Sequence, residues 1–310
     1  MKILVTGAAG FIGSALSEEL LKRNFDVYGI DCFLEDSYDP KIKVQRAKYL
    51  EREFNFQIDN LDLRHDSLDS AIKNVDIIVN LAAMPGLIKS WSQFDVYVNC
   101  NLVAVERILK NKNFSASKFI QASTSSIYGM NAIGNELSEC KPYSPYGVSK
   151  LAAENLLHAY GANFGVKYSI LRYFSVYGPG QRPDMAYSKF CNWILQHKPV
   201  IVYGDGTDTR SNTYISDCVD ATINAIVGSC SNQIYNISGS QQIDVKKAIE
   251  IIADELQLQP QVINVEKRPG DQRETKGDSS RAQRDLNFLE TVGIEEGLRR
   301  QARHHKLWNN

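Results

Sequence analysis

The chain has 310 residues, of which 43% are hydrophobic and 23% charged, and its formal net charge at pH 7 is −1. This is the composition of an ordinary globular protein that is long enough for a large core and a second lobe. The near-zero charge excludes a general electrostatic field for nucleic acid or anionic lipid, so any anion has to be bound at a local site.

The cysteines and the apolar runs narrow the class of protein further. The six cysteines are scattered and form no CxxC pair, which predicts reduced thiols in the cytoplasm, no disulfide framework and no metal site. No apolar run approaches the roughly 18 residues of a membrane helix. We therefore expect a cytoplasmic protein without a membrane or nucleic-acid partner.

Short β-rich runs alternate with helical patterns through the first half of the chain. Strands are predicted at 2–7, 27–31, 75–83, 118–124 and 168–174, and helices at 11–23, 95–111 and 144–165. Ser144 and Pro145 make a good cap and first turn for the last of these helices. Strand and helix in series predict a parallel sheet wound by right-handed crossovers.

The pattern loosens after about residue 175 into loops, helices and short strands. This predicts a smaller α/β lobe that is partly interleaved with the first domain, and the helical segment 216–228 is expected to return to the sheet. We assign 1–174, together with 213–228, to a Rossmann-type doubly wound domain, and 175–212 and 229–310 to a substrate-binding lobe.

A glycine-rich loop separates the first strand from the first helix. TGAAGFIG places Gly7, Gly10 and Gly13 there, where the backbone can turn tightly and a pyrophosphate can approach the helix N-terminus. A glycine triplet alone more often marks a plain turn. Its position after a strand and before a helix favours a dinucleotide site.

Asp31 ends the second predicted strand. An acidic side chain at this position can accept hydrogen bonds from both ribose hydroxyls of an adenosine and would repel a 2′-phosphate. No arginine lies beside it in the sequence, so NAD is favoured over NADP. The alternative is a solvated turn residue.

Tyr146 and Lys150 lie four residues apart on a predicted helix and therefore share one face. A tyrosine is a poor base at neutral pH because its reference pKa is about 10, and a nearby ammonium group together with a cationic nicotinamide would lower that value. Taken alone, YxxxK is frequent by chance, and a solvated tyrosine is the simpler interpretation.

Hydroxyl groups gather at the end of another predicted strand, which favours the catalytic interpretation. ASTSSIYG places Ser123, Thr124, Ser125 and Ser126 there. The carboxyl edge of a parallel sheet is where ligands bind, and hydroxyls there can exchange hydrogen bonds with a sugar oxygen. Local backbone hydrogen bonding explains one or two of these hydroxyls better than all four.

Together these motifs resemble the extended short-chain dehydrogenase/reductases, specifically the nucleotide-sugar epimerase/dehydratase family, over nearly the whole chain. TGAAGFIG, Asp31, LAA at 81–83, Thr124, YGVSK and RYFSVYGP occur in the family's order. The resemblance implies an NAD that stays bound through turnover, with Tyr146, Lys150 and Thr124 as catalytic residues. The implied NAD contacts are Gly7, Gly10, Phe11, Ile12, Gly13, Asp31, Asn60, Leu61, Leu81, Ala82, Ala83, Asn101, Tyr146 and Lys150.

The second half carries features that resemble the family's sugar-nucleotide contacts. Arg210, Arg268 and Asp271 stand where the family holds the diphosphate and the nucleotide ribose, and an arginine fork suits a diphosphate. RSNTYI departs from the family's RDFxYI at Ser211 and Asn212. The implied substrate contacts are Pro85, Thr124, Ser125, Ser126, Ser175, Arg182, Met185, Lys189, Val202, Tyr203, Arg210, Arg268 and Asp271.

SVYGPGQRPDMA, from Ser175 to Ala186, resembles the branch of the family that acts on uronic acids, the UDP-glucuronate 4-epimerases. AAMPGLIKSW at 82–91 resembles a loop of the same branch. A uronate carboxylate in a closed pocket needs a partner, and Arg182 suits it. Arg182 bracing its own loop, or contacting phosphate, remains the alternative.

The implied reaction is inversion at C4 of the sugar. Tyr146 takes the proton of the 4-hydroxyl, NAD takes the hydride of C4, and both return after the 4-keto sugar has turned over, while Thr124 hydrogen-bonds the 4-oxygen. Ser125 and Ser126 occupy the places where dehydratases of the family carry an Asp-Glu pair. Their identity argues against dehydration, and the absence of a glutamate there argues for retention of CO₂.

Three other functions stay open at this point. One is a UDP-glucose or UDP-N-acetylglucosamine 4-epimerase with Arg182 on phosphate, a second is a nucleotide 4-ketosugar reductase, and a third is a non-catalytic NAD-binding regulator. The intact Tyr146 and Lys150 weigh against the regulator. The resemblance also implies a homodimer formed through helices near 93–112 and 146–163.

Overall fold

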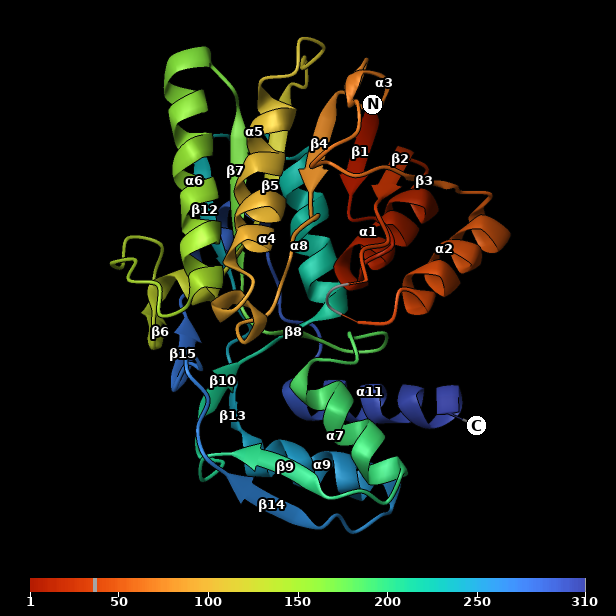
Figure 1. Ribbon diagram of the computed structural model, residues 1–310, viewed down its shortest axis with the longest axis vertical. Helices are drawn as coiled ribbons and strands as arrows, with labels where there is room; N and C mark the ends of the chain where they lie inside the picture. Colours follow the sequence, from red (N-terminus) through yellow and green to blue (C-terminus); the bar gives the residue numbers. More distant parts are fainter. Residues whose placement is uncertain (36–37, 310) are drawn as a thin grey trace.

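The structure is a computed structural model that describes residues 1–35 and 38–309. Figure 1 shows a large sheet flanked by helices in the upper part of the molecule and a smaller lobe below it. The strands are β1 (Lys2–Thr6), β2 (Asp26–Asp31), β3 (Ile58–Asn60), β4 (Ile77–Asn80), β5 (Lys118–Thr124), β6 (Asn131–Gly134), β7 (Tyr168–Tyr173), β8 (Val176–Tyr177), β9 (Val200–Tyr203), β10 (Thr209–Ser211), β11 (Thr213–Tyr214), β12 (Gln233–Ile237), β13 (Gln242–Asp244), β14 (Val262–Val265) and β15 (Glu274–Gly277).

The helices follow the predicted pattern, with one irregularity. The α-helices are α1 (Phe11–Lys22), α2 (Lys41–Phe54), α3 (Asp69–Ile72), α4 (Phe94–Val98), α5 (Ala104–Leu109), α6 (Pro145–Phe164), α7 (Ala186–Leu195), α8 (Ile215–Val227), α9 (Val245–Leu256), α10 (Ser280–Leu286) and α11 (Ile294–Asn309). The helix predicted at 95–111 is interrupted by a π-helical turn, η2 (Asn99–Val103), between α4 and α5. Short 3₁₀ turns are η1 (Lys89–Trp91) and η3 (Ser125–Tyr128).

The large sheet is parallel and has the strand order β12-β7-β5-β4-β1-β2-β3. The chain runs outward from β1 through β2 to β3, then crosses back to β4 and continues outward on the other side. The order therefore reverses between β1 and β4, and such a reversal opens a crevice at the carboxyl ends of the strands. This topology confirms the predicted Rossmann-type α/β fold.

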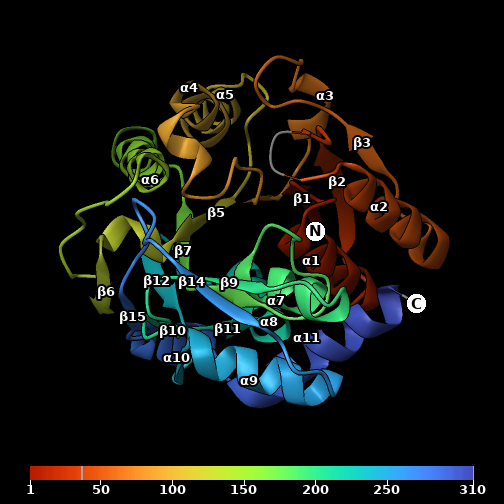
Figure 2. The ribbon, with the colours of Figure 1, turned by 60° about the horizontal axis from the view of Figure 1, so that its bottom comes forward.

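Alternation along the strands sends side chains into two separate core layers. Ile3 and Val5 of β1 pack in one cluster with Leu16 of α1. Leu4, between them, packs in a second cluster with Ile108 of α5. Helices therefore cover both faces of the sheet (Figure 2), as successive side chains of a strand point to opposite faces.

Two segments cross the domain boundaries that were predicted from the sequence. β12 lies within 229–310, which was assigned to the smaller lobe, yet it pairs with β7 at the end of the large sheet. β6 lies within 1–174, yet it pairs with β15 in the four-stranded sheet β13-β10-β15-β6. Both assignments were wrong because short strands carry no mark of the sheet they join. α8 packs against α1 and against β5 and β7.

A buried ion pair joins β7 to α6. Arg172 of β7 and Glu154 of α6 are both 3% exposed, and the Arg172 Nη2 atom is 2.7 Å from Glu154 Oε2. Ser123 Oγ also donates a hydrogen bond to Glu154. Arg172 Nη1 donates to the hydroxyl of Tyr128, which in turn donates to Asn236 Oδ1.

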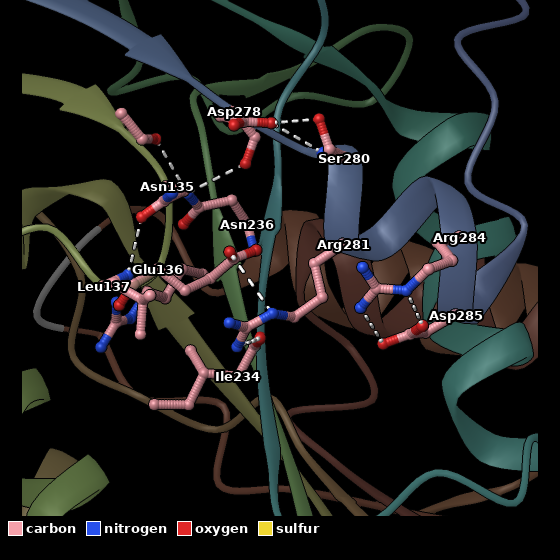
Figure 3. A network of polar contacts seen from close by, with 12 residues as sticks. Asn135, Glu136, Leu137, Ile234, Asn236, Asp278, Ser280, Arg281, Arg284 and Asp285 are labelled. Atoms are coloured by element: carbon pink, nitrogen blue, oxygen red, sulfur yellow. Dashed lines mark hydrogen bonds and ion pairs between the residues drawn. The ribbon is translucent and has the colours of Figure 1, made fainter.

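The same buried polar chain continues into the second lobe (Figure 3). The backbone N–H of Asn236 donates to Glu136 Oε1 at 2.8 Å, and Arg281 of α10 lies 3.7 Å from the other oxygen of this carboxylate. Arg281 also donates to the carbonyl oxygen of Ile234. These contacts fix the outer edge of the large sheet to the C-terminal part of the chain.

Replacing Arg172 by methionine should destabilise the fold strongly. The substitution would leave the Glu154 carboxylate buried without its cation, and breaking such a pair costs about 3–5 kcal/mol. Urea denaturation measures the free energy of unfolding. The control is Lys247→Met, which breaks the exposed pair with Glu250 and should cost less than about 1 kcal/mol. Equal losses in the two variants would refute this account of the network.

Candidate active site

The glycine loop is as tight as the sequence predicts. Gly7 has φ +68°, and a Cβ atom on Gly13 would lie 2.1 Å from the carbonyl oxygen of Gly7. α1 then begins with no side-chain cap and no acidic residue in its first turn. Its first N–H groups and its dipole therefore suit an anion. Phe11 is buried and Ile12 packs against the same core.

The end of β4 lies against this loop, as expected at the reversal of strand order. A Cβ on Gly7 would approach the backbone nitrogen of Ala82 to 2.9 Å. That N–H donates to Thr6 Oγ1 at 3.1 Å, and Thr6 donates in turn to Asn80. The segment Leu81, Ala82 and Ala83 is partly buried here, so the expected NAD contacts from the two strands lie together.

Asp31 is held in one orientation at the end of β2. It is 4% exposed, its Oδ2 accepts from the N–H of Ala9 at 3.2 Å, and its Oδ1 accepts from the N–H of Phe33 at 2.8 Å. Lys43 of α2 lies 3.0 Å from Oδ1. The sequence analysis missed this cation, which only the fold brings near. A fixed carboxylate at this position fits the ribose of a dinucleotide.

A groove between α2 and β3 continues from Asp31. Phe33, Val44, Ala47 and Asn60 are among the residues that line it. Asn60 ends β3, and the N–H of Leu61 donates to the carbonyl oxygen of Asp31 at 3.1 Å. Asn60 and Leu61, two of the expected NAD contacts, therefore lie next to the Asp31 carboxylate, beside a groove whose lining is both apolar and polar.

The expected catalytic residues converge where β5 meets α6. Ser144 caps α6 by accepting from the N–H of Gly147 at 3.2 Å, as predicted. This places Tyr146 in the first turn, where its hydroxyl is hydrogen-bonded to Thr124, the last residue of β5. Thr124 Oγ1 also accepts from the N–H of Ser126 at 3.1 Å. Lys150, one turn further along α6, donates to the carbonyl oxygen of Ala122 at 2.6 Å.

Three influences act on the pKa of Tyr146, and their net effect is to raise it. Burial raises its pKa, whereas the hydrogen bond with Thr124 and the positive charge of Arg182 lower it. Burial lowers the pKa of Lys150 to about 8, with the charge of Glu154 acting in the opposite direction. Arg182 is therefore a protein cation that favours the Tyr146 phenolate, and the sequence analysis did not anticipate this effect.

Two residues of the α4–η2 segment hold the catalytic helix in place. Tyr97 is fully buried, and its ring meets that of Tyr146 edge to face, with centroids 6.1 Å apart. Its hydroxyl donates to the carbonyl oxygen of Pro85. Asn101 donates to Met84 O and to Ser149 Oγ, both at 3.0 Å, and accepts from the N–H of Met84. Asn101 thus ties the 82–86 loop to α6, and Tyr97 was missed because a buried aromatic on a helix is typical of any core.

Arg182 lies at the reacting end of the site. Its side chain is 16% exposed, and its Nε and Nη2 atoms bind the two oxygens of Asp184 at 2.9 and 2.7 Å. Its charge acts on the hydroxyls of Tyr146 and Tyr97. Met185 precedes α7, with its sulfur 3.8 Å from Arg182. Ser175, between β7 and β8, has φ +20°.

A second group of cations lies in the smaller lobe. Arg268 stacks 3.9 Å above the ring of Tyr203 and pairs with Asp271 at 2.9 Å. Burial lowers the pKa values of Lys189 and Arg210, and the charge of Arg268 lowers them further. The five side chains therefore form one cluster that suits a diphosphate and its nucleoside.

Three of the expected substrate contacts are engaged with the protein itself, namely Arg210, Val202 and Ser125. Arg210 donates to the carbonyl oxygens of Thr209 and Arg273. Val202 is 2% exposed and belongs to the core, so its side chain is turned away from a ligand. Gln272, which the sequence analysis missed, donates to Ser125 O and Gly129 O. It joins the cation cluster to the catalytic strand.

Other kinds of site find no support in the described part of the chain. Residues 1–35 and 38–309 contain no group of three or more His, Cys, Asp or Glu side chains placed to hold a metal. Over the same residues, no helix combines the length and apolarity that a membrane crossing requires.

Comparison with known proteins gives a consistent result. The sequence pattern of the NAD dependent epimerase/dehydratase family matches residues 3–238. The uncharacterized UDP-glucose epimerase YtcB of Bacillus subtilis is 41% identical over 305 residues, covering 96% of both chains. A UDP-glucuronate 4-epimerase of Thermodesulfobacterium geofontis is 36% identical, covering 96% of this chain and 94% of the relative.

A solved structure superimposes closely on the fold. It is the UDP-glucuronic acid 4-epimerase from Bacillus cereus in complex with UDP-glucuronic acid and NAD. The TM-score is 0.95 at 37% sequence identity, and the alignment covers 99% of this chain and 100% of the other.

Proposed function

The chain belongs to the NAD-dependent epimerase/dehydratase family, and from this premise we propose that it interconverts UDP-glucuronate and UDP-galacturonate by inverting C4 of the sugar. The observation that carries the substrate assignment is the position of Arg182. Its charge acts on Tyr146 at the reacting end, whereas a separate cluster of Arg210, Arg268 and Lys189 is available for the diphosphate.

Bound NAD supplies the hydride acceptor and donor for C4. The residues of the chain manage the accompanying proton. Tyr146 takes the proton of the 4-hydroxyl as C4 is oxidised and returns it when C4 is reduced, so there is no net redox change. Thr124 holds the tyrosine oxygen and orients the sugar oxygen beside it. Lys150, fixed on Ala122 O, is placed to hold the nicotinamide ribose.

Arg182 explains why a charged sugar is tolerated. A uronate carboxylate buried without a partner costs several kcal/mol. Nε and Nη2 of Arg182 are taken up by Asp184, and among the described residues its Nη1 atom makes no hydrogen bond. This edge of the guanidinium can bind the carboxylate while Asp184 keeps the fork in place.

Binding of the carboxylate by Arg182 also protects the 4-keto intermediate. Oxidation of a uronate at C4 gives a β-keto acid, which loses CO₂ when the bond to the carboxylate aligns with the carbonyl π system. Ser126, next but one to Thr124, offers a hydroxyl donor to the carboxylate, and neither Ser125 nor Ser126 can act as an acid or a base. A carboxylate held by Ser126 and Arg182 is kept from that alignment.

Assembly and location form part of the proposal. We propose a homodimer formed through α4, α5 and α6, because Phe94 and Val148 on these helices are 42% and 46% exposed and exposed apolar side chains favour an interface. We further propose that the enzyme works in the cytoplasm and supplies UDP-galacturonate for polysaccharide biosynthesis. The cysteine thiols, none of which forms a disulfide, agree with this location.

Purified protein given UDP-glucuronate and no added cofactor should form UDP-galacturonate to a constant ratio, followed by NMR of the sugar. The reaction needs no external oxidant because the hydride returns to the same carbon. Epimerisation of UDP-glucose or UDP-N-acetylglucosamine, with no conversion of UDP-glucuronate, would establish the hexose alternative. The B. subtilis relative is named as a UDP-glucose epimerase. Release of a UDP-pentose would refute the protective role of Arg182.

Tyr146→Phe should reduce the rate of epimerisation by about 10²–10⁴-fold, the usual contribution of a positioned acid–base group. The substitution removes only the hydroxyl oxygen and keeps the ring contact with Tyr97. Tyr143→Phe is the matched control, because Tyr143 lies three residues earlier and is 47% exposed. If both variants turn over at the wild-type rate, Tyr146 does not carry the proton.

Arg182→Ala and Arg268→Ala should have different specificities. Loss of Arg182 should raise KM for UDP-glucuronate while leaving the inhibition constant of UDP nearly unchanged, because UDP has no sugar carboxylate. Loss of Arg268 should weaken UDP and UDP-glucuronate by a similar factor. Steady-state kinetics with UDP as competitive inhibitor separates the two. Parallel weakening of both ligands by Arg182→Ala would place this arginine on phosphate.

A further inference from the structure

Arg46 of α2 bridges two loops that lie far apart in the sequence. Its Nη1 atom donates to the carbonyl oxygen of Ala9 at 3.4 Å and to the hydroxyl of Tyr38 at 3.3 Å. Its Nη2 atom donates to the carbonyl oxygen of Gly180 at 2.5 Å. One guanidinium therefore joins the glycine loop to the loop that carries Arg182.

This contact lies beside the residues expected to hold the cofactor. The N–H of Ala9 donates to the carboxylate of Asp31. Gly180 has φ +79°, and a Cβ atom on it would lie 3.9 Å from the ring of Phe11, the first residue of α1. The Gly180 end of the loop therefore lies next to the helix N-terminus that suits a pyrophosphate.

The base of the same loop is anchored more firmly. Gln301 of α11, which is fully buried, accepts from the N–H of Gly178 at 2.9 Å and donates to Gln181 at 2.8 Å. Gln181 also accepts from the N–H of Ser188. Buried amide groups therefore fix Gly178 and Gln181. Gly180, which lies between them in the sequence, is instead bound by the partly exposed Arg46.

We propose that Arg46 is a positioning residue that clasps the loop Gly178–Met185 onto the glycine loop and thereby sets how slowly NAD leaves the protein. An enzyme that returns a hydride to the carbon it came from must keep its cofactor between the two half-reactions. The contacts of Arg46 meet this need, because losing the hydrogen bond to Gly180 would let the two loops separate. The proposal depends on NAD as the cofactor and not on the identity of the sugar nucleotide.

The positive charges of Arg46 and Arg182 favour a stronger contact between the two loops when a dinucleotide is bound. Burial and the like charge of Arg182 lower the pKa of Arg46, so the two guanidinium groups repel each other. An anion at the glycine loop offsets this repulsion. Ligand binding and loop closure therefore favour one another, as linkage requires.

The test is the rate at which bound NAD exchanges with added fluorescent etheno-NAD in the full-length protein. We expect Arg46→Leu, which keeps much of the side-chain volume but has no donors, to exchange at least about tenfold faster than wild type, since tenfold corresponds to about 1.4 kcal/mol, within the range of one or two lost hydrogen bonds. The control is Arg52→Leu on the same helix, whose side chain is 72% exposed, pairs with Glu53 and lies over the ring of Tyr49. Its exchange rate should equal that of wild type.

Arg46→Lys guards against a variant that merely unfolds. An ammonium group keeps the charge but not the fork that reaches Ala9 O and Gly180 O at once, so exchange should be accelerated by several-fold with an unchanged melting temperature. Exchange in Arg46→Lys as slow as in wild type would overturn the proposal, whether or not the sugar assignment holds.

Discussion

The parallel pairing of β1 with β2 on one side and β4 on the other is the constraint on which the site depends. Parallel strands end at the same edge of the sheet, so the polar residues that follow them lie close together. The carboxylate of Asp31 and the backbone of Ala82 lie against the glycine loop for this reason. Thr124 ends β5 at the same edge of the sheet.

Cations are divided between the two ends of the site. Burial lowers the pKa of Lys150 to about 8, and its ammonium group donates to the carbonyl oxygen of Ala122. Arg182 keeps its charge at any relevant pH and acts on Tyr146 directly. In the proposed function, Arg182 both favours the phenolate and binds the substrate carboxylate, whereas Arg210 and Arg268 bind the diphosphate.

Local patterns predicted the parts of the site that are contiguous in sequence. The glycine turn, the cap at Ser144 and the one-turn spacing of Tyr146 and Lys150 depend on near neighbours, and the structure reproduces them. Lys43, Arg46, Tyr97 and Gln272 could not be found this way, because each acts through a contact that only the folded chain creates. The same limit explains β6 and β12, whose few residues pair with strands that are distant in sequence.

A single loop links substrate choice to cofactor retention. Arg182 faces the reacting end, while Gly180, two residues earlier, is bound to Arg46 beside the glycine loop. A substrate that engages Arg182 therefore contacts the same loop that Arg46 joins to the glycine loop. The keto sugar must rotate inside the pocket while the cofactor carries the hydride. A loop that responds to both ligands keeps them together for that interval, which explains why one short glycine- and proline-rich segment carries both contacts.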